Sequence, residues 1–150
     1  YATTRAKLAA YLRRKLRERG WEGSGEPPVD SLIERMTRLG YVDDRAFATA
    51  RAASLGRRGY GERRIGAAIR AAGIDDHDSS DARELARDNA WNAALRFAER
   101  RRIGPFAASE AARPEREKAI AAMLRAGHSL HLSRRIAAAR PGEIPEPDSA

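Results

Sequence analysis

Residues 56–64 read Gly-Arg-Arg-Gly-Tyr-Gly-Glu-Arg-Arg, and the segments on both sides have helical hydrophobic spacing. Gly59 and Gly61 allow a tight turn with positive φ, and helical residues resume near Tyr60–Glu62. A nucleotide-binding P-loop needs Gly-x-x-x-x-Gly-Lys-Ser/Thr after a buried strand, and neither is present here. The stretch therefore predicts a helix–turn–helix-like junction.

Working outward from this junction, almost every segment is predicted to be helical and none has a clear strand pattern. Alanine and arginine dominate the sequence, and both favour helices. Asp75–Ser80 is predicted to be an acidic link, Asp88–Asn89 a division between helices, and the segment between Pro105 and Pro114 (within 104–116) a loosely ordered insert. The predicted helices cover residues 4–18, 30–39, 43–57, 62–72, 81–102, 114–127 and 129–140, with Thr4, Asp43 and Ser129 as caps.

Four of these helices end on a glycine, at positions 20, 40, 73 and 127. A large apolar residue stands four positions before each glycine: Leu16, Met36, Ile69 and Met123. The intervals are irregular, which excludes a strict solenoid period. The shared pattern predicts related short helical units stacked side by side. We expect one all-α domain over 1–140, with approximate repeats 1–40, 41–88 and 89–140, and a disordered acidic, proline-containing tail over 141–150.

The net charge of +8 is unevenly placed. Residues 1–74 hold 16 Lys and Arg against 8 Asp and Glu, whereas residues 75–150 hold 13 of each. A binding face explains this asymmetry, although an arginine-rich genome remains an alternative. The chain has no cysteine and no apolar run of membrane-spanning length, so we expect a cytoplasmic protein without disulfides.

The sequence offers no recognisable catalytic constellation. The three histidines form no metal-binding pair, and for His128 and His131 a solvated or packing role outweighs a metal site. Asp43 and Asp44 are adjacent on a helix, so a cap and a helix-dipole acid explain them without catalysis. We expect no enzyme activity, no metal and no cofactor.

Binding is the more promising chemistry. The amides that begin the helix after Gly61 and the arginines around them are predicted to converge on one site for a phosphodiester or an acidic protein surface. A solvated turn over Tyr60 is the alternative. The run Arg100-Arg101-Arg102 ends a helix and is weaker evidence. The predicted contact residues are Arg57, Arg58, Tyr60, Arg63, Arg64 and Arg70, extended by Arg13, Arg14 and Arg17.

Five segments together resemble the RecX family of recombination regulators over roughly residues 3–140. They are GYVDDRAFA at 40–48, RRGYGERRIGAAIRAAGI at 57–74, TTRAKLAAYLRRKLRERGW at 3–21, RRRIGPF at 100–106 and EKAIAAMLRAGHS at 117–129. The resemblance implies an elongated, curved, all-α fold of three tandem three-helix repeats. Because the sequence starts at Tyr1, the first repeat is expected to be incomplete.

The resemblance also implies a partner. Members of the family bind the RecA recombinase filament on DNA, occupy its helical groove, hinder its growth and inhibit recombinase and coprotease activity; some bind DNA directly. We therefore expect a monomeric, non-enzymatic regulator, with single- or double-stranded DNA as a further ligand of the basic patches. The alternative is a helix–turn–helix-like module that binds DNA without sequence preference, because the helix over 61–72 presents arginines but no base-reading amide.

Overall fold

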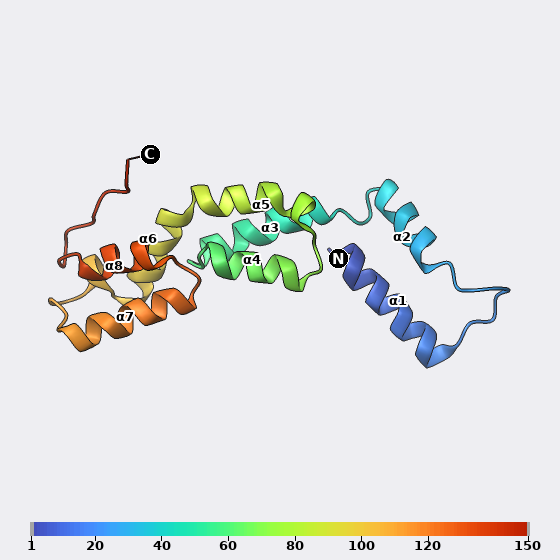
Figure 1. Cartoon of the computed structure of the whole chain (residues 1–150), viewed down its shortest axis with the longest axis horizontal. Coiled ribbons are helices and arrows are strands. Elements are labelled where there is room, and N and C mark those ends of the chain that lie inside the picture. The colour runs from blue at the N-terminus through green and yellow to red at the C-terminus, as the bar shows by residue number, and fades with distance from the viewer. Residues whose placement is uncertain (1, 150) are drawn as a thin grey trace.

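The chain forms an elongated row of helices in the computed structural model, which describes residues 2–149 (Figure 1). Within those residues there are eight α-helices, one short 3-10 helix and no strand, so the predicted all-α class is confirmed. The first unit contains α1 (Arg5–Arg19) and α2 (Val29–Arg38). The second contains α3 (Asp44–Arg57), α4 (Glu62–Ala71) and α5 (Asp76–Asp88). The third contains α6 (Ala90–Arg101), η1 (Gly104–Phe106), α7 (Arg113–Arg125) and α8 (Leu130–Ala138).

Three helices begin at the residues that the sequence predicts as caps. The side chains of Thr4, Asp43 and Ser129 each accept a hydrogen bond from the backbone N–H three residues later. Each bond satisfies an amide that has no partner within its helix. Pro114 lies in the first turn of α7, as predicted. The helical units follow one another as expected, and the exact repeat boundaries remain a prediction.

Two of the predicted loops are wrong in part. Residues 76–80 are not a link but the start of α5, because Asp75 caps the helix and Asp76 and Asp78 stabilise its positive first turn. The predicted division near Asn89 is correct. The insert after Arg102 is not loosely ordered at its start, because η1 packs against α6 and α8 and buries Pro105.

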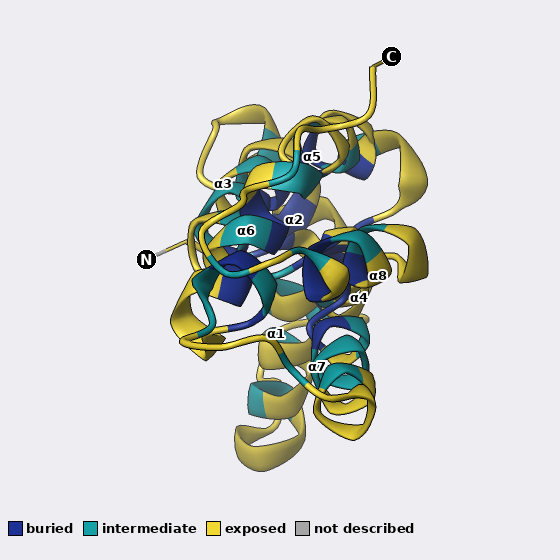
Figure 2. Ribbon diagram, turned by 90° about the vertical axis from the view of Figure 1, so that its left-hand side faces the viewer, coloured by how far each residue is buried: buried dark blue, intermediate teal, exposed yellow. Residues whose placement is uncertain are grey.

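The core lies in the second and third units. Figure 2, which views the molecule along its length, shows buried residues toward the middle of the helix array and exposed residues around its outside. Small alanines such as Ala48, Ala82 and Ala94 are fully buried, which lets helices approach closely, and the larger Ile65, Ile69, Met123 and Ile136 fill the space between them. In contrast, α1 has no buried residue and α2 buries only Ile33. The first unit therefore depends on its contact with the second unit for its position.

The C-terminal segment after Ala139 runs beside α8. Gly142 donates a backbone hydrogen bond to the Pro105 carbonyl, at 2.8 Å, and Asp148 contacts His131 and Arg135. The disorder predicted for 141–150 stays a prediction, and residue 150 lies outside the described residues. Within the part of the chain that the structure describes, no helix is long and apolar enough to span a bilayer.

Candidate binding surface at the seam between units

The quoted stretch 56–64 lies at a seam between the second and third units. Its end meets the turn that joins α7 to α8, where the Gly61 N–H donates to the Ala126 carbonyl at 2.9 Å and the Arg63 N–H donates to the Gly127 carbonyl at 3.2 Å. We call this contact of residues 61–64 with 126–128 the inner seam. The predicted anion site is therefore wrong for the Arg63 amide, because a protein carbonyl occupies it.

Glycine makes the inner seam possible. A Cβ atom on Gly61 would lie 2.5 Å from the Gly127 carbonyl carbon and oxygen, and a Cβ on Gly127 would lie 2.5 Å from the Arg64 backbone nitrogen. Gly127 also has a φ of +97°, a conformation that other residues rarely adopt. The backbones of the two units thus touch directly, with no room for side chains between them.

His128 closes the inner seam from inside. Its side chain is only 1% exposed, and its Nε2 lies 2.8 Å from the Gly59 carbonyl. The ring packs against Phe97 with a centroid distance of 5.7 Å. Burial lowers the pKa of His128, and the hydrogen bond to Gly59 only partly offsets that effect. This histidine has a packing role, and among residues 2–149 no group of three potential metal ligands occurs.

A second seam of the same design joins the first and second units. The Thr4 hydroxyl donates to the Ala72 carbonyl at 2.7 Å, and a Cβ on Gly73 would clash with the Ala6 side chain. Asp44, buried in the first turn of α3, accepts a hydrogen bond from the Arg5 N–H at 2.9 Å. We call this contact the outer seam. Desolvation raises the pKa of Asp44, and this tertiary role goes beyond the dipole role expected from sequence.

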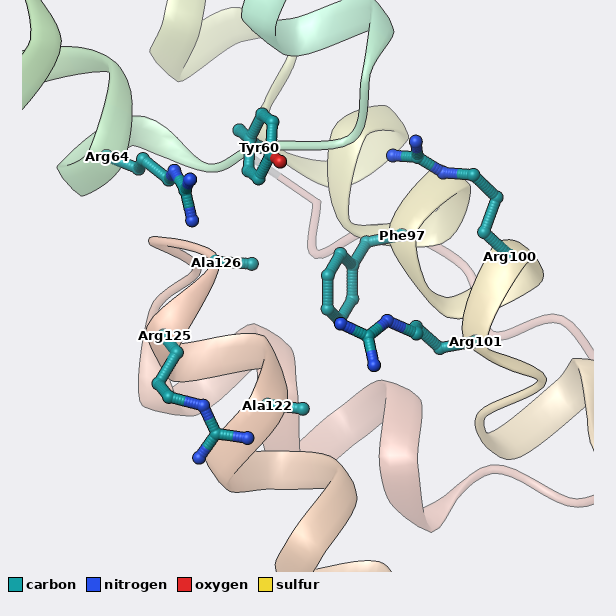
Figure 3. Close-up of a pocket in the computed structure, with 8 residues that line it drawn as sticks. All are labelled: Tyr60, Arg64, Phe97, Arg100, Arg101, Ala122, Arg125 and Ala126. Carbon is teal, nitrogen blue, oxygen red and sulfur yellow. The ribbon is translucent and has the colours of Figure 1, made fainter.

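A basic hollow opens beside the inner seam (Figure 3). Its volume is about 430 Å³. The guanidinium group of Arg64 lies 4.1 Å from the centre of the Tyr60 ring, and that of Arg101 lies 5.4 Å from the centre of the Phe97 ring. We call this space the arginine hollow, and its lining residues are Tyr60, Arg64, Phe97, Arg100, Arg101, Ala122, Arg125 and Ala126.

The structure divides the predicted contact residues among three neighbouring hollows. Arg64 lines the arginine hollow, and Arg58, which does not line it, lies 5.3 Å from the centre of the same Tyr60 ring. Arg63 and Arg70 line a second hollow with Arg87 of α5. Arg57 lines a third, which reaches Tyr60 from the other side and includes Arg96. The nine residues therefore do not converge on one point, and α4 lies between two basic surfaces.

The N-terminal arginines lie apart from these hollows on α1. Arg13 pairs with Asp30 at 3.2 Å, and Arg14 pairs with Glu18 at 3.8 Å. Arg17 lies in the last turn of the helix, where positive charge complements the dipole. Acidic neighbours thus partly neutralise this cluster.

The arginines around the inner seam form no ion pairs of this kind among the described residues. Within residues 2–149, no salt bridge involves Arg57, Arg58, Arg63, Arg64, Arg70, Arg96, Arg100, Arg101 or Arg125. Sequence reasoning gave little weight to Arg100 and Arg101 and missed Arg96 and Arg125 altogether. The run of three arginines at 100–102 indicates this basic surface in the sequence. Arg96 and Arg125, in contrast, join the surface only through tertiary packing.

The surface offers guanidinium donors held over aromatic rings, and such donors suit the binding of anions. No protein family's sequence profile matches the chain. Over 151 residues the chain is 28% identical to a protein named Regulatory protein RecX from Myxococcus xanthus (strain DK1622), covering 94% of this chain and 80% of that protein. A second Regulatory protein RecX, from Mycobacterium sp. (strain JLS), is 38% identical over 76 residues, covering 49% of this chain and 39% of that protein. Both relatives are named as regulatory proteins. These relatives confirm the resemblance to the RecX family that the motifs indicate.

Proposed function

We propose that this protein binds the RecA recombinase filament and inhibits recombinase and coprotease activity without covalent chemistry. It acts as a cytoplasmic monomer that occupies the groove of the filament and hinders the addition of subunits. The similarity to two proteins named Regulatory protein RecX supports the partner. The observation that carries the proposal in this chain is the set of unpaired arginines on both sides of α4.

The shape of the molecule fits this mechanism. Successive helical units form an elongated body (Figure 1), so one molecule can contact several sites along a groove. Unpaired arginines favour association with an acidic or phosphate-lined groove, because their charge is not already neutralised within the protein. Occupation of the groove then excludes an incoming subunit sterically.

DNA binding through a recognition helix is less well supported. The N-terminal end of α4, which such a helix would present to base edges, is covered at the inner seam by residues 126–128. Arg63 and Arg70 remain exposed and can contact phosphates. Any direct DNA binding by this surface is expected to be indifferent to sequence and to weaken steeply with salt.

The decisive experiment adds the protein to RecA on single-stranded DNA and follows ATP turnover and strand exchange. Both are expected to fall at stoichiometric protein. Replacing Arg57 and Arg58 with Glu should weaken co-sedimentation with the filament at least about tenfold. The matched pair Arg13→Glu and Arg14→Glu removes the same charge from a cluster that is already neutralised, so its effect should be smaller.

Three results would count against the proposal: undiminished ATP turnover and strand exchange, equal losses in the two charge-reversal pairs, or a sequence-specific footprint on duplex DNA. Titration against unrelated duplexes at two salt concentrations tests the third result directly. The thermal midpoint of each variant shows that the fold is intact.

A further inference from the structure

We infer that the arginine hollow is a binding site for an oligophosphate, either free or as the phosphate chain of a nucleotide. The inference goes beyond the proposed regulatory function, because the site is complete within one molecule and needs no recombinase. Three helices build it: α4 supplies Arg64, α6 supplies Arg100 and Arg101, and α7 supplies Arg125 (Figure 3).

The first reason is the uncompensated charge. Four arginines line a space of about 430 Å³, and its lining includes no aspartate or glutamate. Among the described residues none of the four has an acidic partner elsewhere. Like charges held around one space repel one another. A ligand that carries several negative charges in a small volume relieves this repulsion.

The second reason is the chemistry of the lining. Guanidinium groups donate hydrogen bonds and accept none, and the Tyr60 hydroxyl is the only other polar side-chain group of the hollow. An oligophosphate presents oxygen acceptors, which arginine binds with two parallel hydrogen bonds. A peptide would instead bring backbone N–H groups that need acceptors. The volume also lies within the range of about 300–1,000 Å³ that small-ligand sites have.

The third reason separates this ligand from a nucleic-acid strand. Single strands bind proteins largely by stacking their bases on aromatic rings. Here Arg64 covers the Tyr60 ring and Arg101 covers the Phe97 ring, at 4.1 and 5.4 Å. The rings thus position guanidinium groups rather than offer free faces. The hollow favours phosphate groups over bases.

The backbone of the quoted stretch makes room for this arrangement. A Cβ on Gly59 would lie 2.6 Å from a terminal guanidinium nitrogen of Arg100 and 3.0 Å from the Phe97 backbone nitrogen. Glycine at this position therefore lets Arg100 extend over the turn. Because Arg64 belongs to the second unit and the other three arginines to the third, a bound anion would connect the two units.

The test is isothermal titration of the protein with inorganic tripolyphosphate and with ATP, with sulfate at equal ionic strength as reference. We expect saturable one-to-one binding of tripolyphosphate and a raised thermal midpoint.

The double variant Arg100→Gln, Arg101→Gln should weaken binding of tripolyphosphate at least about tenfold. The control Arg35→Gln, Arg38→Gln removes the same charge from α2 and should bind within twofold of wild type. Tighter binding of ATP would identify a nucleotide, and equal binding would identify the phosphate chain alone.

Equal weakening in the two double variants would overturn the inference, because it would show attraction to net charge only. Binding no stronger than that of sulfate would also overturn it. So would displacement of tripolyphosphate by a thymidine oligonucleotide at a lower phosphate concentration, which would assign the hollow to a nucleic-acid strand. None of these outcomes depends on RecA, so this inference and the proposed function can fail separately. Thermal midpoints without ligand confirm that the variants fold.

Discussion

The inner and outer seams use the same geometry but different chemical groups. In each, the residue that begins one helix donates a hydrogen bond to the carbonyl of an alanine that ends another, Ala126 or Ala72, and a glycine follows that alanine. At the inner seam the donor is the Gly61 backbone, and His128 is buried behind it. At the outer seam the donor is the Thr4 hydroxyl, with Asp44 beside it.

The difference teaches how such an array is held together. At both seams the first residues of one helix contact the turn that ends another helix. Neighbouring units are therefore joined by local contacts rather than by one continuous core. At the inner seam two backbone segments are in direct contact, so this contact has little freedom to adjust. The outer seam rests on side chains and on a first unit with almost no core, so it should open at a lower free energy.

The largest expected effect is that of Gly127→Ala at the inner seam. The new methyl group would meet the Arg64 backbone, and the positive φ adds strain. Together these should lower the free energy of unfolding by roughly 3–4 kcal/mol. Urea unfolding followed by circular dichroism measures the loss.

Gly40→Ala is the matched control for this substitution. Gly40 also follows a helix with positive φ, at +79°, and has the same backbone hydrogen-bond pattern as Gly127, but a Cβ atom added there would have no neighbouring atom within 4 Å. It should lose only about 1–2 kcal/mol, from the backbone strain alone. Equal losses at the two positions would show that the close approach across the inner seam contributes nothing.

The next effect is a loss of stability of the inner seam in mild acid. Burial lowers the pKa of His128 in the folded state below its ordinary value of 6.5. The unfolded chain therefore binds more protons below pH 6.5, and stability present above that pH is lost as the pH falls through the folded pKa. One unit below 6.5, the loss from this group is at most about 1.4 kcal/mol.

Urea midpoints at pH 7.5 and 5.5 measure this change. His128→Gln cannot titrate, so its two midpoints should lie closer together than those of the wild type, whatever its overall stability. His77→Gln, at an exposed position outside every ion pair of the described residues, should retain the wild-type difference. A wild-type difference preserved in His128→Gln would assign the acid sensitivity to another group.

Much of the fold could be predicted from sequence because its signals are local. The predicted caps Thr4, Asp43 and Ser129 all function as caps, and the helix-ending glycines at 20, 40, 73 and 127 all have positive φ. The start of α5 was missed because a run of acids was interpreted as a link, although acids also stabilise the first turn of a helix.

The surface could be predicted only in part, because its composition depends on which units touch. The glycines of the quoted stretch predicted a turn, but that Gly61 faces Gly127 follows from tertiary packing. The same packing brings Arg125 next to Arg64, although 61 positions separate them in the sequence. The spacing of residues within one helix carries no information about such a pair.

At the outer seam, Thr4→Val should have a smaller effect, and one confined to the first unit. Valine keeps the shape of threonine but removes the cap of α1 and the donor to the Ala72 carbonyl, at a cost of about 1–2 kcal/mol. Amide hydrogen exchange in α1 should accelerate about tenfold, while exchange in α4 to α8 stays unchanged. Ser129→Ala, which removes the cap of α8, should leave exchange in α1 unaltered. Acceleration spread evenly over all three units would show that the outer seam does not open by itself.

The smallest effect should distinguish the two seams by the sign of their pH dependence. Burial raises the folded-state pKa of Asp44 above its ordinary 3.8, so the stability this group contributes is present below 3.8 and is lost as the pH rises through the folded pKa. Acid therefore favours the outer seam through Asp44, whereas it disfavours the inner seam through His128.

Asp44→Asn tests this sign, because asparagine keeps an acceptor for the Arg5 N–H and does not titrate. At pH 7 the free energies of unfolding of the two proteins should differ by less than about 1 kcal/mol. As the pH falls toward 3.8, exchange in α1 should slow in the wild type relative to the variant measured at the same pH. A ratio that stays constant with pH would show that Asp44 is equally solvated in the docked and undocked states, and the two seams would then differ in pH dependence through His128 alone.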